Sequence, residues 1–360
     1  MEVSTIGGTR RVVVIGTGLI GTSVALALRE RGDEVRLADR DPASVRMAAE
    51  LGAGVPLDDG DGPADIAVLA VPPAAVAATL LDAQKRDLAR FYTDVASVKA
   101  RPLREAAELG CDLGRFVAGH PLAGRERSGP AAARSDLFLG RPWALCPTPE
   151  SSPQAVEAVT ALAEACGAQT VVVDAEEHDR AVALVSHGPH VTAAAMAARL
   201  ESAPEIALGL AGQGVRDVTR IAASDPGLWI GILSSNADAV ADVIDAVAAD
   251  LAATAAALRD GAETAVTGLL QRGGAGRSRL PGKHGDRAGT YAVVSVVIPD
   301  RPGELALLFQ AAGVAGVNIE DVTIEHSPGR PVGVVELSVT PAAAQRLADE
   351  LRARGWSVPG

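Results

Sequence analysis

His120 lies in the stretch GHPLAGRERSG, residues 119–129, between a glycine and a proline and ahead of three charged side chains. A histidine titrates near neutral pH, so it can act as a general base, a metal ligand or a neutral residue bonded to nearby backbone. The six histidines of the chain show no HExxH-type spacing with a carboxylate third ligand, so no metal is expected. The stretch therefore makes His120 a candidate for acid–base chemistry.

A glycine-rich turn near the start of the chain predicts a bound dinucleotide cofactor. Residues 11–15 are a short β-branched run that leads into GTGLIG, residues 16–21, and then into a helical pattern. In such a turn Gly16 permits the sharp bend, Gly18 lets the backbone approach a pyrophosphate, and Gly21 lets the helix pack close to the strand. Asp39 ends the next expected strand, where a carboxylate binds both ribose hydroxyls and repels a 2′-phosphate. NAD is therefore predicted rather than NADP. The predicted cofactor-binding residues are Gly16, Gly18, Leu19, Ile20, Gly21, Asp39, Arg40, Val71 and Pro72.

The elements that must position these residues alternate between strands and helices in the first half of the chain. This pattern predicts an α/β Rossmann domain with a doubly wound parallel sheet over residues 10–174. Residues 175–270 lose the strand signal and carry apolar, small-residue-rich helical segments, which predicts an all-α helical dimerisation domain and a homodimer. Residues 271–289 are glycine-rich and basic, typical of a flexible linker. Residues 290–360 follow the order strand, helix, strand, strand, helix of a small α+β module. The apolar runs expected as strands of the first domain are 11–15, 34–38, 65–71, 91–95, 143–146 and 169–173.

Composition excludes several classes of function. The chain has 360 residues, 48% of them hydrophobic and 22% charged, and no apolar run long enough to cross a bilayer. The first residues show no secretory signal, so we expect a cytoplasmic protein. A net charge of −12 argues against nucleic-acid binding. The three cysteines are scattered without a CxxC spacing, which predicts neither a disulfide framework nor a zinc site.

Four polar clusters fall where such a sheet presents its ligand face or where the helical region covers it. Together they resemble the prephenate and arogenate dehydrogenase family over roughly residues 10–265. The last 70 residues resemble an ACT domain, a small-molecule-sensing module, through DRPGELALLF and GVNIEDV. The four clusters are DVASVK (94–99), GHPLAGRE (119–126), SHGPH (186–190) and RDVTRIAASDPGLW (216–229).

The reaction that the resemblance implies needs one base and one cation. Moving the C4 hydride of prephenate to a nicotinamide while removing the C4 hydroxyl proton gives a ketone that loses CO2 and becomes aromatic. His120 fits the base, and by resemblance Ser97 hydrogen-bonds its imidazole, although Ser97 could also cap a helix. Arg220 fits the cation, since its planar fork can grip the ring carboxylate. The alternative for Arg220 is a surface arginine paired with Asp217.

The resemblance implies further substrate-binding residues. His190 would contact the pyruvyl side chain, the alternative being a core histidine with satisfied hydrogen bonds, and Ser186 would be a further substrate contact. Glu126 matches a family position in a gating or polar network, and Trp229 matches one that reaches a neighbouring subunit's site. Their alternatives are a solvated loop charge and a core aromatic residue. Gly188 departs from the family, which often carries a larger apolar residue there, so the local helix geometry is expected to differ. Lys99 could attract substrate or cap the helix that it begins, and it is left outside the catalytic set.

Other functions remain as alternatives. Arogenate dehydrogenase stays open, because one extra carboxylate in the pocket could favour the amino group of arogenate, and Glu126, Asp179 and Asp217 are the candidates. A 4-amino-4-deoxyprephenate dehydrogenase is disfavoured because an attached ACT domain suits feedback-controlled primary metabolism better. A β-hydroxyacid dehydrogenase or imine reductase is disfavoured because those enzymes place a catalytic lysine on the helical domain, and residues 175–270 contain none. A non-catalytic sensor of NAD and amino acids would not need His120 or Arg220. For the ACT-like module, tyrosine is the expected allosteric effector near Gly303 and Asn318, the alternative being that the module only stabilises a dimer.

Overall fold

The computed structural model describes residues 9–58, 60–124, 129–280, 291–326 and 331–359. Internal contacts divide the chain into two units, Met1–Val247 and Ala248–Gly360, which we describe separately. Glu126 lies outside the described residues.

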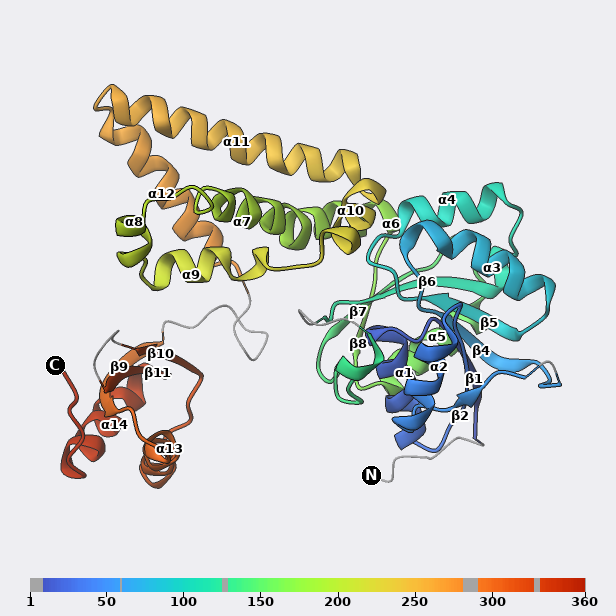
Figure 1. Cartoon of the computed structure of the whole chain (residues 1–360), viewed down its shortest axis with the longest axis horizontal. Coiled ribbons are helices and arrows are strands. Elements are labelled where there is room, and N and C mark those ends of the chain that lie inside the picture. Colours follow the sequence, from blue (N-terminus) through green and yellow to red (C-terminus); the bar gives the residue numbers. More distant parts are fainter. Residues whose placement is uncertain (1–8, 59, 125–128, 281–290, 327–330, 360) are drawn as a thin grey trace. The chain divides into compact units, whose positions relative to one another are not determined.

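The first unit is built on an eight-stranded sheet with the order β3-β2-β1-β4-β5-β6-β7-β8 (Figure 1). Neighbouring strands from β3 to β6 are parallel, as predicted, but β6 and β7 are antiparallel. The sheet is therefore mixed, because no crossover helix joins these two strands in the described residues between them. The sequence analysis also missed β3 and β6. The strands are β1 (Arg11–Ile15), β2 (Glu34–Ala38), β3 (Val55–Pro56), β4 (Ala64–Leu69), β5 (Ala89–Asp94), β6 (Phe116–Pro121), β7 (Pro142–Cys146) and β8 (Gln169–Val172).

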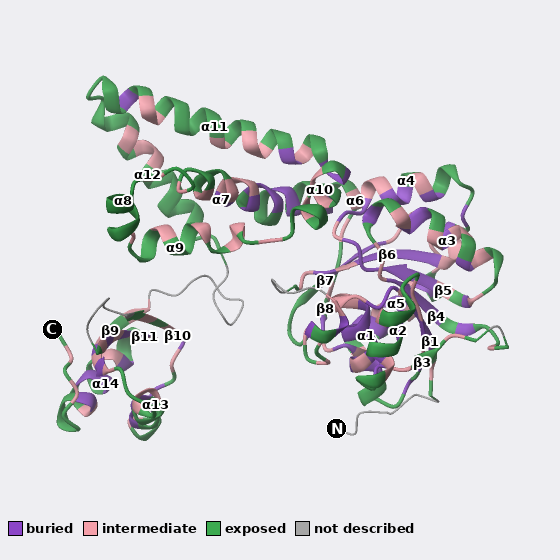
Figure 2. Ribbon diagram, in the orientation of Figure 1, coloured by how far each residue is buried: buried purple, intermediate pink, exposed green. Residues whose placement is uncertain are grey.

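Helices cover both faces of this sheet, which confirms the doubly wound arrangement. Along β1, Val12 and Val14 belong to one core and Val13 to the other, since alternate side chains of a strand point to opposite faces. Figure 2 shows this buried interior along the strands. Helices α1 (Leu19–Glu30), α2 (Pro42–Glu50) and α5 (Pro153–Ala165) contribute to the first core, and α3 (Val76–Lys85) and α4 (Ala100–Glu108) to the second.

After β8 the first unit is helical, as predicted. A π-helical turn, η4 (Ala183–His187), joins α6 to α7 without a break, so the helix runs from residue 175 to 198. Within the described residues, no helix combines the length and apolar character needed to span a membrane. The helices are α6 (Ala175–Val182), α7 (Gly188–Ala198), α8 (Glu205–Gly209), α9 (Gln213–Thr219), the 3-10 turn η5 (Arg220–Ala222), α10 (Pro226–Ser235) and α11 (Ala237–Arg259), which crosses into the second unit.

Gly188, the residue that departs from the family pattern, lies where α7 meets α11. A Cβ built on Gly188 would lie 2.5 Å from Val243 Cγ1 and 3.0 Å from the Ala183 carbonyl oxygen. A larger residue would force the two helices apart, so the glycine permits their close approach.

The second unit contains α12 (Glu263–Arg277) and a three-stranded antiparallel sheet with the order β10-β11-β9. Helix α12 extends through residues 271–277, which were predicted as linker. There Arg272 Nη2 bonds Asp250 Oδ1 of α11 at 2.6 Å, an interaction that the glycine-rich composition does not reveal. Residues 281–290 lie outside the described ones. The remaining elements are β9 (Ala292–Pro299), α13 (Glu304–Val314), β10 (Asp321–His326), β11 (Val332–Val339) and α14 (Pro341–Ala353), in the predicted order.

Candidate active site

The glycine-rich turn between β1 and α1 has the geometry that its sequence predicted. Gly16 has a φ of 102°, and a Cβ built on it would lie 2.1 Å from the Ala70 carbonyl oxygen. A Cβ on Gly21 would lie 1.9 Å from the Gly16 carbonyl oxygen, so only glycine lets the helix lie this close to the turn. A Cβ on Gly18 would meet nothing within 4 Å. The backbone at Gly18 is therefore open to a pyrophosphate at the N-terminus of α1.

Asp39 is held at the end of β2, facing this turn. Its Oδ2 accepts hydrogen bonds from Thr17 N at 2.6 Å and Thr17 Oγ1 at 3.2 Å, and its Oδ1 accepts one from Asp41 N at 2.9 Å. A pocket of about 360 Å³ adjoins the carboxylate. These residues fit the adenosine part of NAD, with the acidic group at the ribose position. The pocket is lined by Leu37, Ala38, Asp39, Pro42, Val45, Arg46, Pro56, Leu57 and Arg86.

The other predicted cofactor residues lie at the same edge of the sheet. Leu19 and Ile20 begin α1, Val71 and Pro72 follow β4, and Arg40 follows Asp39 as an exposed residue. Because the carboxyl ends of parallel strands share one edge, this is where a Rossmann fold binds its ligand.

His120 lies near the carboxyl end of β6, two strands from β4 in the same sheet. Its Nδ1 makes a 2.9 Å hydrogen bond with His178 Nε2 of α6. The two rings meet edge to face, with centroids 5.1 Å apart. Ser97, the predicted partner of His120, lies in a bend after β5, and no bond between the two is seen in the described residues. The role of Ser97 stays a prediction.

The hydrogen-bonded chain continues from His178 to Asp179. His178 Nδ1 lies 2.8 Å from Asp179 Oδ1. The same carboxylate accepts hydrogen bonds from the backbone N–H groups of Lys99 at 2.8 Å and Ala100 at 2.9 Å, at the N-terminus of α4. Both His178 and Asp179 are buried. This chain links His120 to the start of a neighbouring helix.

A buried ion pair lies beneath His120. Lys99 Nζ bonds Asp94 Oδ2 and also donates to the Gly119 carbonyl oxygen at 2.6 Å. Asp94 Oδ1 accepts a hydrogen bond from Gly119 N at 3.1 Å, so both backbone groups of Gly119 are held. Both side chains of the pair are fully buried. Lys99 therefore neither caps α4 with its side chain nor meets substrate, and it fixes the backbone next to His120.

Burial lowers the pKa of His120 well below 6.5, and the positive charge of Lys99 and the neighbouring rings of His178 and His187 lower this pKa further. His120 is therefore neutral at pH 7 and holds a lone pair that can accept a proton.

A second cluster brings together residues that the sequence analysis assigned to the substrate. The ring of His190 stacks on Trp229, with centroids 3.5 Å apart and an interplanar angle of 7°. His187 meets Trp229 edge to face at 6.2 Å. Asn236 Nδ2 donates to the Asp179 carbonyl oxygen at 2.8 Å and lies 3.2 Å from His187 Nδ1. Asn236 therefore joins this cluster to the chain that ends at His120. Burial lowers the pKa of both His187 and His190.

The remaining predicted site residues lie on exposed helical turns of the first unit and in the second unit. Arg220 begins η5 and is exposed, and Ser186 is exposed within η4. Asp217 Oδ1 accepts a hydrogen bond from Gln213 Nε2 at 2.7 Å. In the second unit, Gly303 has a φ of 92° ahead of α13, and Asn318 Nδ2 donates to Glu320 Oε1 at 2.7 Å. The roles of these residues remain predictions.

The sequence analysis did not single out His178, and it considered Asp179 only as a carboxylate that could select arogenate. A signal was present, because helical spacing places these two polar residues on the same face as the apolar Ala175 and Val182. A histidine and an aspartate on an inward face need hydrogen-bond partners, which points to a buried network.

Comparisons with known proteins agree with this geometry. Residues 24–172 match the family model "Prephenate dehydrogenase, nucleotide-binding domain", and residues 174–272 match "Prephenate dehydrogenase, dimerization domain". The chain is 43% identical over 358 residues to "Probable prephenate dehydrogenase NovF" of Streptomyces niveus, covering 96% of this chain and 99% of that protein. It is 32% identical over 245 residues to prephenate dehydrogenase of Bacillus subtilis, covering 65% of this chain and 66% of that protein.

Solved structures show the same similarity. Prephenate dehydrogenase from A. aeolicus, in complex with hydroxyphenyl propionate and NAD+, superposes with a TM-score of 0.68 at 28% identity, covering 76% of this chain and 99% of that chain. Arogenate dehydrogenase of Synechocystis superposes with a TM-score of 0.64 at 26% identity, covering 75% of this chain and 99% of that chain.

Proposed function

The chain belongs to the prephenate dehydrogenase family, and from that premise we propose that it converts prephenate to 4-hydroxyphenylpyruvate by NAD-dependent oxidative decarboxylation, with His120 as the base. The observation that carries the proposal is the neutral, firmly held His120 at the sheet edge that also presents the glycine-rich turn.

The glycine-rich turn at residues 16–21 and Asp39 would hold NAD, which would supply the acceptor for the C4 hydride of the substrate. His120 accepts the proton of the C4 hydroxyl, so that the C–O bond becomes a carbonyl as the hydride leaves. The bond between C1 and its carboxylate then breaks, CO2 departs, and the electron pair completes the aromatic ring while the C4 oxygen takes the proton back from the His120 imidazolium. No further oxidant is needed.

The substrate must be held by groups other than the base. Arg220 would grip the ring carboxylate with its guanidinium fork. His190, whose ring stacks on Trp229, would contact the pyruvyl side chain, and Ser186 would be a further substrate contact. Glu126 would belong to a gating or polar network. Ser97 would lie against the C4 hydroxyl and His120.

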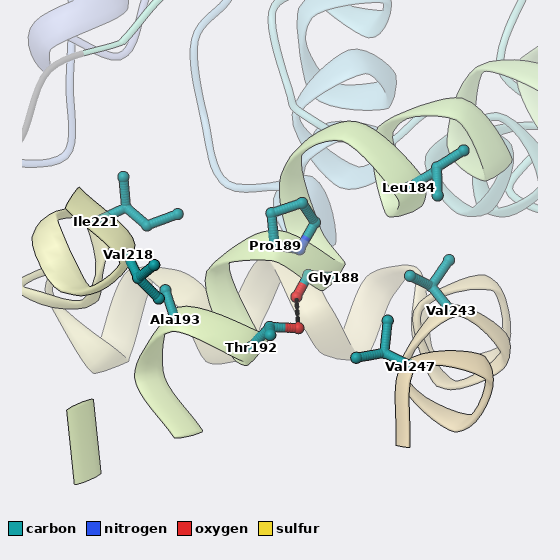
Figure 3. Close-up of a pocket in the computed structure, with 9 residues that line it drawn as sticks. All are labelled: Leu184, Gly188, Pro189, Thr192, Ala193, Val218, Ile221, Val243 and Val247. Atoms are coloured by element: carbon teal, nitrogen blue, oxygen red, sulfur yellow. Dashed lines mark hydrogen bonds between the residues drawn. The ribbon is translucent and has the colours of Figure 1, made fainter. Parts of the chain in front are cut away.

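The helical region would make the protein a homodimer. It exposes large apolar side chains, among them Leu184 and Val218, which a monomer seldom leaves uncovered over so many positions. An apolar pocket of about 340 Å³ lies between α7, α11 and the segment from α9 to η5. Figure 3 shows the residues that line it. A helix of the second subunit would cover it. Sedimentation analysis should give twice the chain mass. The pocket is lined by Leu184, Gly188, Pro189, Thr192, Ala193, Val218, Ile221, Val243 and Val247.

The C-terminal module would be an ACT domain that binds tyrosine near Gly303 and Asn318. Its order of elements supports this assignment, and a bridge between Val297 and Ser357 adds a further pairing beside β9.

Replacing the base tests the proposal. His120→Asn should lower kcat by roughly 10²-fold to 10⁴-fold, the usual worth of a positioned base, and leave NAD affinity unchanged. NADH formation with prephenate and with arogenate measures both turnover and substrate choice. Turnover of the unmodified protein with neither substrate would overturn the proposal, and turnover of the variant at the normal rate would overturn the assignment of His120.

A further inference from the structure

We propose that His178 and Asp179 are positioning residues that fix the tautomer of His120, keeping the proton on Nδ1 and leaving Nε2 as the atom that accepts the substrate proton. The inference rests on the proposed role of His120 as the base and adds which of its nitrogens acts and what selects it.

The direction of the hydrogen bonds starts at Asp179. Backbone N–H groups can only donate, and two of them, from Lys99 and Ala100, point at this carboxylate. An aspartate carboxylate accepts hydrogen bonds and has no proton of its own to donate. The remaining partner of the carboxylate, His178 Nδ1, must therefore be the donor.

The rest of the chain then follows from the valence of a neutral imidazole. With its proton on Nδ1, neutral His178 has only a lone pair at Nε2. His120 Nδ1, 2.9 Å away, must carry a proton to satisfy that lone pair. Neutral His120 is thereby left with its lone pair on Nε2.

The same arrangement supports His120 after it has accepted the proton. The imidazolium that forms keeps its Nδ1–H donated to His178, whose Nδ1–H points at the Asp179 carboxylate, so a negative charge lies at the end of the chain. The other charged or titratable groups around His120 are Lys99, whose charge opposes the imidazolium and which is itself paired with Asp94, and His187.

His178 and Asp179 are held rigidly enough for this task. Asn236 holds the carbonyl of Asp179 from a separate element. Neither ring nor carboxylate is free to turn, because both are buried. Helix α6 therefore supplies a positioning partner on the Nδ1 side of His120.

The direct test is the protonation pattern of the six histidine rings in the full-length enzyme labelled with ¹⁵N-histidine. Long-range ¹H–¹⁵N NMR spectra distinguish the Nδ1–H from the Nε2–H form, and assignment uses single His→Asn variants. We expect His120 as the Nδ1–H form and His178 neutral with its proton on Nδ1. His120 as the Nε2–H form, or His178 as an imidazolium at pH 7, would overturn the proposal. This readout does not depend on the identity of the substrate, so a failure of the proposed function would be seen separately.

Kinetics of two variants provide the second test. His178→Phe keeps a ring but removes both nitrogens, and kcat should fall about 10-fold to 10²-fold, the usual loss when a group that orients a working histidine is removed. KM for prephenate should stay unchanged, since His178 would not touch substrate. His178→Gln keeps a side-chain oxygen that can accept from His120 Nδ1, and it should recover most of the activity.

Asp174→Ala is the matched control, because it weakens the cap of α6 without touching the hydrogen-bonded chain. It should lower thermal stability but leave kcat and the NMR pattern of His120 unchanged. If Asp174→Ala lowered kcat as much as His178→Phe, or if the glutamine variant were no better than the phenylalanine variant, the effect of His178 would be merely structural and the proposal would fail.

Discussion

Lys99 and Asp94 form a buried ion pair, and replacing one or the other should lower the stability of the protein by different amounts. Replacing Lys99 should also change the pH dependence of catalysis. Removing either partner leaves the other charge buried, and such losses cost about 3 to 5 kcal/mol. The two residues do not share the same remaining partners. Asp94 would keep two backbone donors, Ala96 N at 3.0 Å and Gly119 N at 3.1 Å, whereas Lys99 would keep one acceptor, the Gly119 carbonyl oxygen. Lys99→Met should therefore fall at the lower end of the range and Asp94→Ala at the upper end.

Differential scanning calorimetry at one fixed protein concentration measures this difference as a shift in melting temperature. At about 2 to 4 °C per kcal/mol for a domain of this size, Lys99→Met should lower the melting temperature by roughly 6 to 12 °C and Asp94→Ala by roughly 10 to 20 °C. The double variant Lys99→Met with Asp94→Asn should recover at least half of the melting temperature lost in Lys99→Met, because no uncompensated charge remains.

The pH dependence of kcat/KM gives a second readout of the same perturbation. The Lys99 charge disfavours the imidazolium of His120 and so lowers its pKa. Removing that charge should raise this pKa, and the acid limb of kcat/KM should move to higher pH in Lys99→Met. A variant as stable as the unmodified protein, or an acid limb that moved to lower pH, would refute the reasoning.

Three further perturbations test the cofactor, substrate and effector assignments. Arg220→Ala should raise KM for prephenate at least 10-fold with a smaller effect on kcat, because the ring carboxylate must be held before it leaves; a fall in kcat alone would reassign Arg220 to the transition state. Asp39→Ser should narrow the preference for NAD over NADP in steady-state kinetics, and equal use of both by the unmodified protein would contradict the assignment. A chain ending after Leu280, beyond the end of α12, should retain activity and lose inhibition by tyrosine, whereas unchanged, purely competitive inhibition would place tyrosine at the active site.

Local sequence patterns were sufficient to predict the cofactor turn. The tasks of Gly16, Gly18 and Gly21 depend on a bend, an open backbone and a close contact within one short segment, and each is visible in the spacing of the glycines. The helical character of residues 175–270 was equally predictable, since helical periodicity is a local signal.

Features that depend on distant residues were not predictable in this way. Strand β6 was missed because Gly119 and Pro121 interrupt the usual strand composition, and its pairing with β7 replaces the expected parallel neighbour. The contact between His120 and His178 joins residues 58 positions apart, so no spacing in the sequence reveals it. Lys99 was expected to attract substrate or to cap the helix that it begins, and its burial is explained by its partners, Asp94 and the Gly119 carbonyl oxygen.

The π-helical turn at Ala183–His187 sets the rotation of α7 relative to α6. Residues on its two sides can therefore face different partners. An α-helix advances about 100° per residue, and a π turn holds one more residue than the α-helical turn it replaces. Deleting one residue there would restore regular α-helix and rotate α7 relative to α6 by roughly that angle. After such a deletion, His178 could still contact His120, or His190 could still contact Trp229, but the two contacts could not form at the same time. Single-residue deletions in this segment should therefore be far less tolerated than substitutions, and homologous chains that keep both contacts should keep the same length between them.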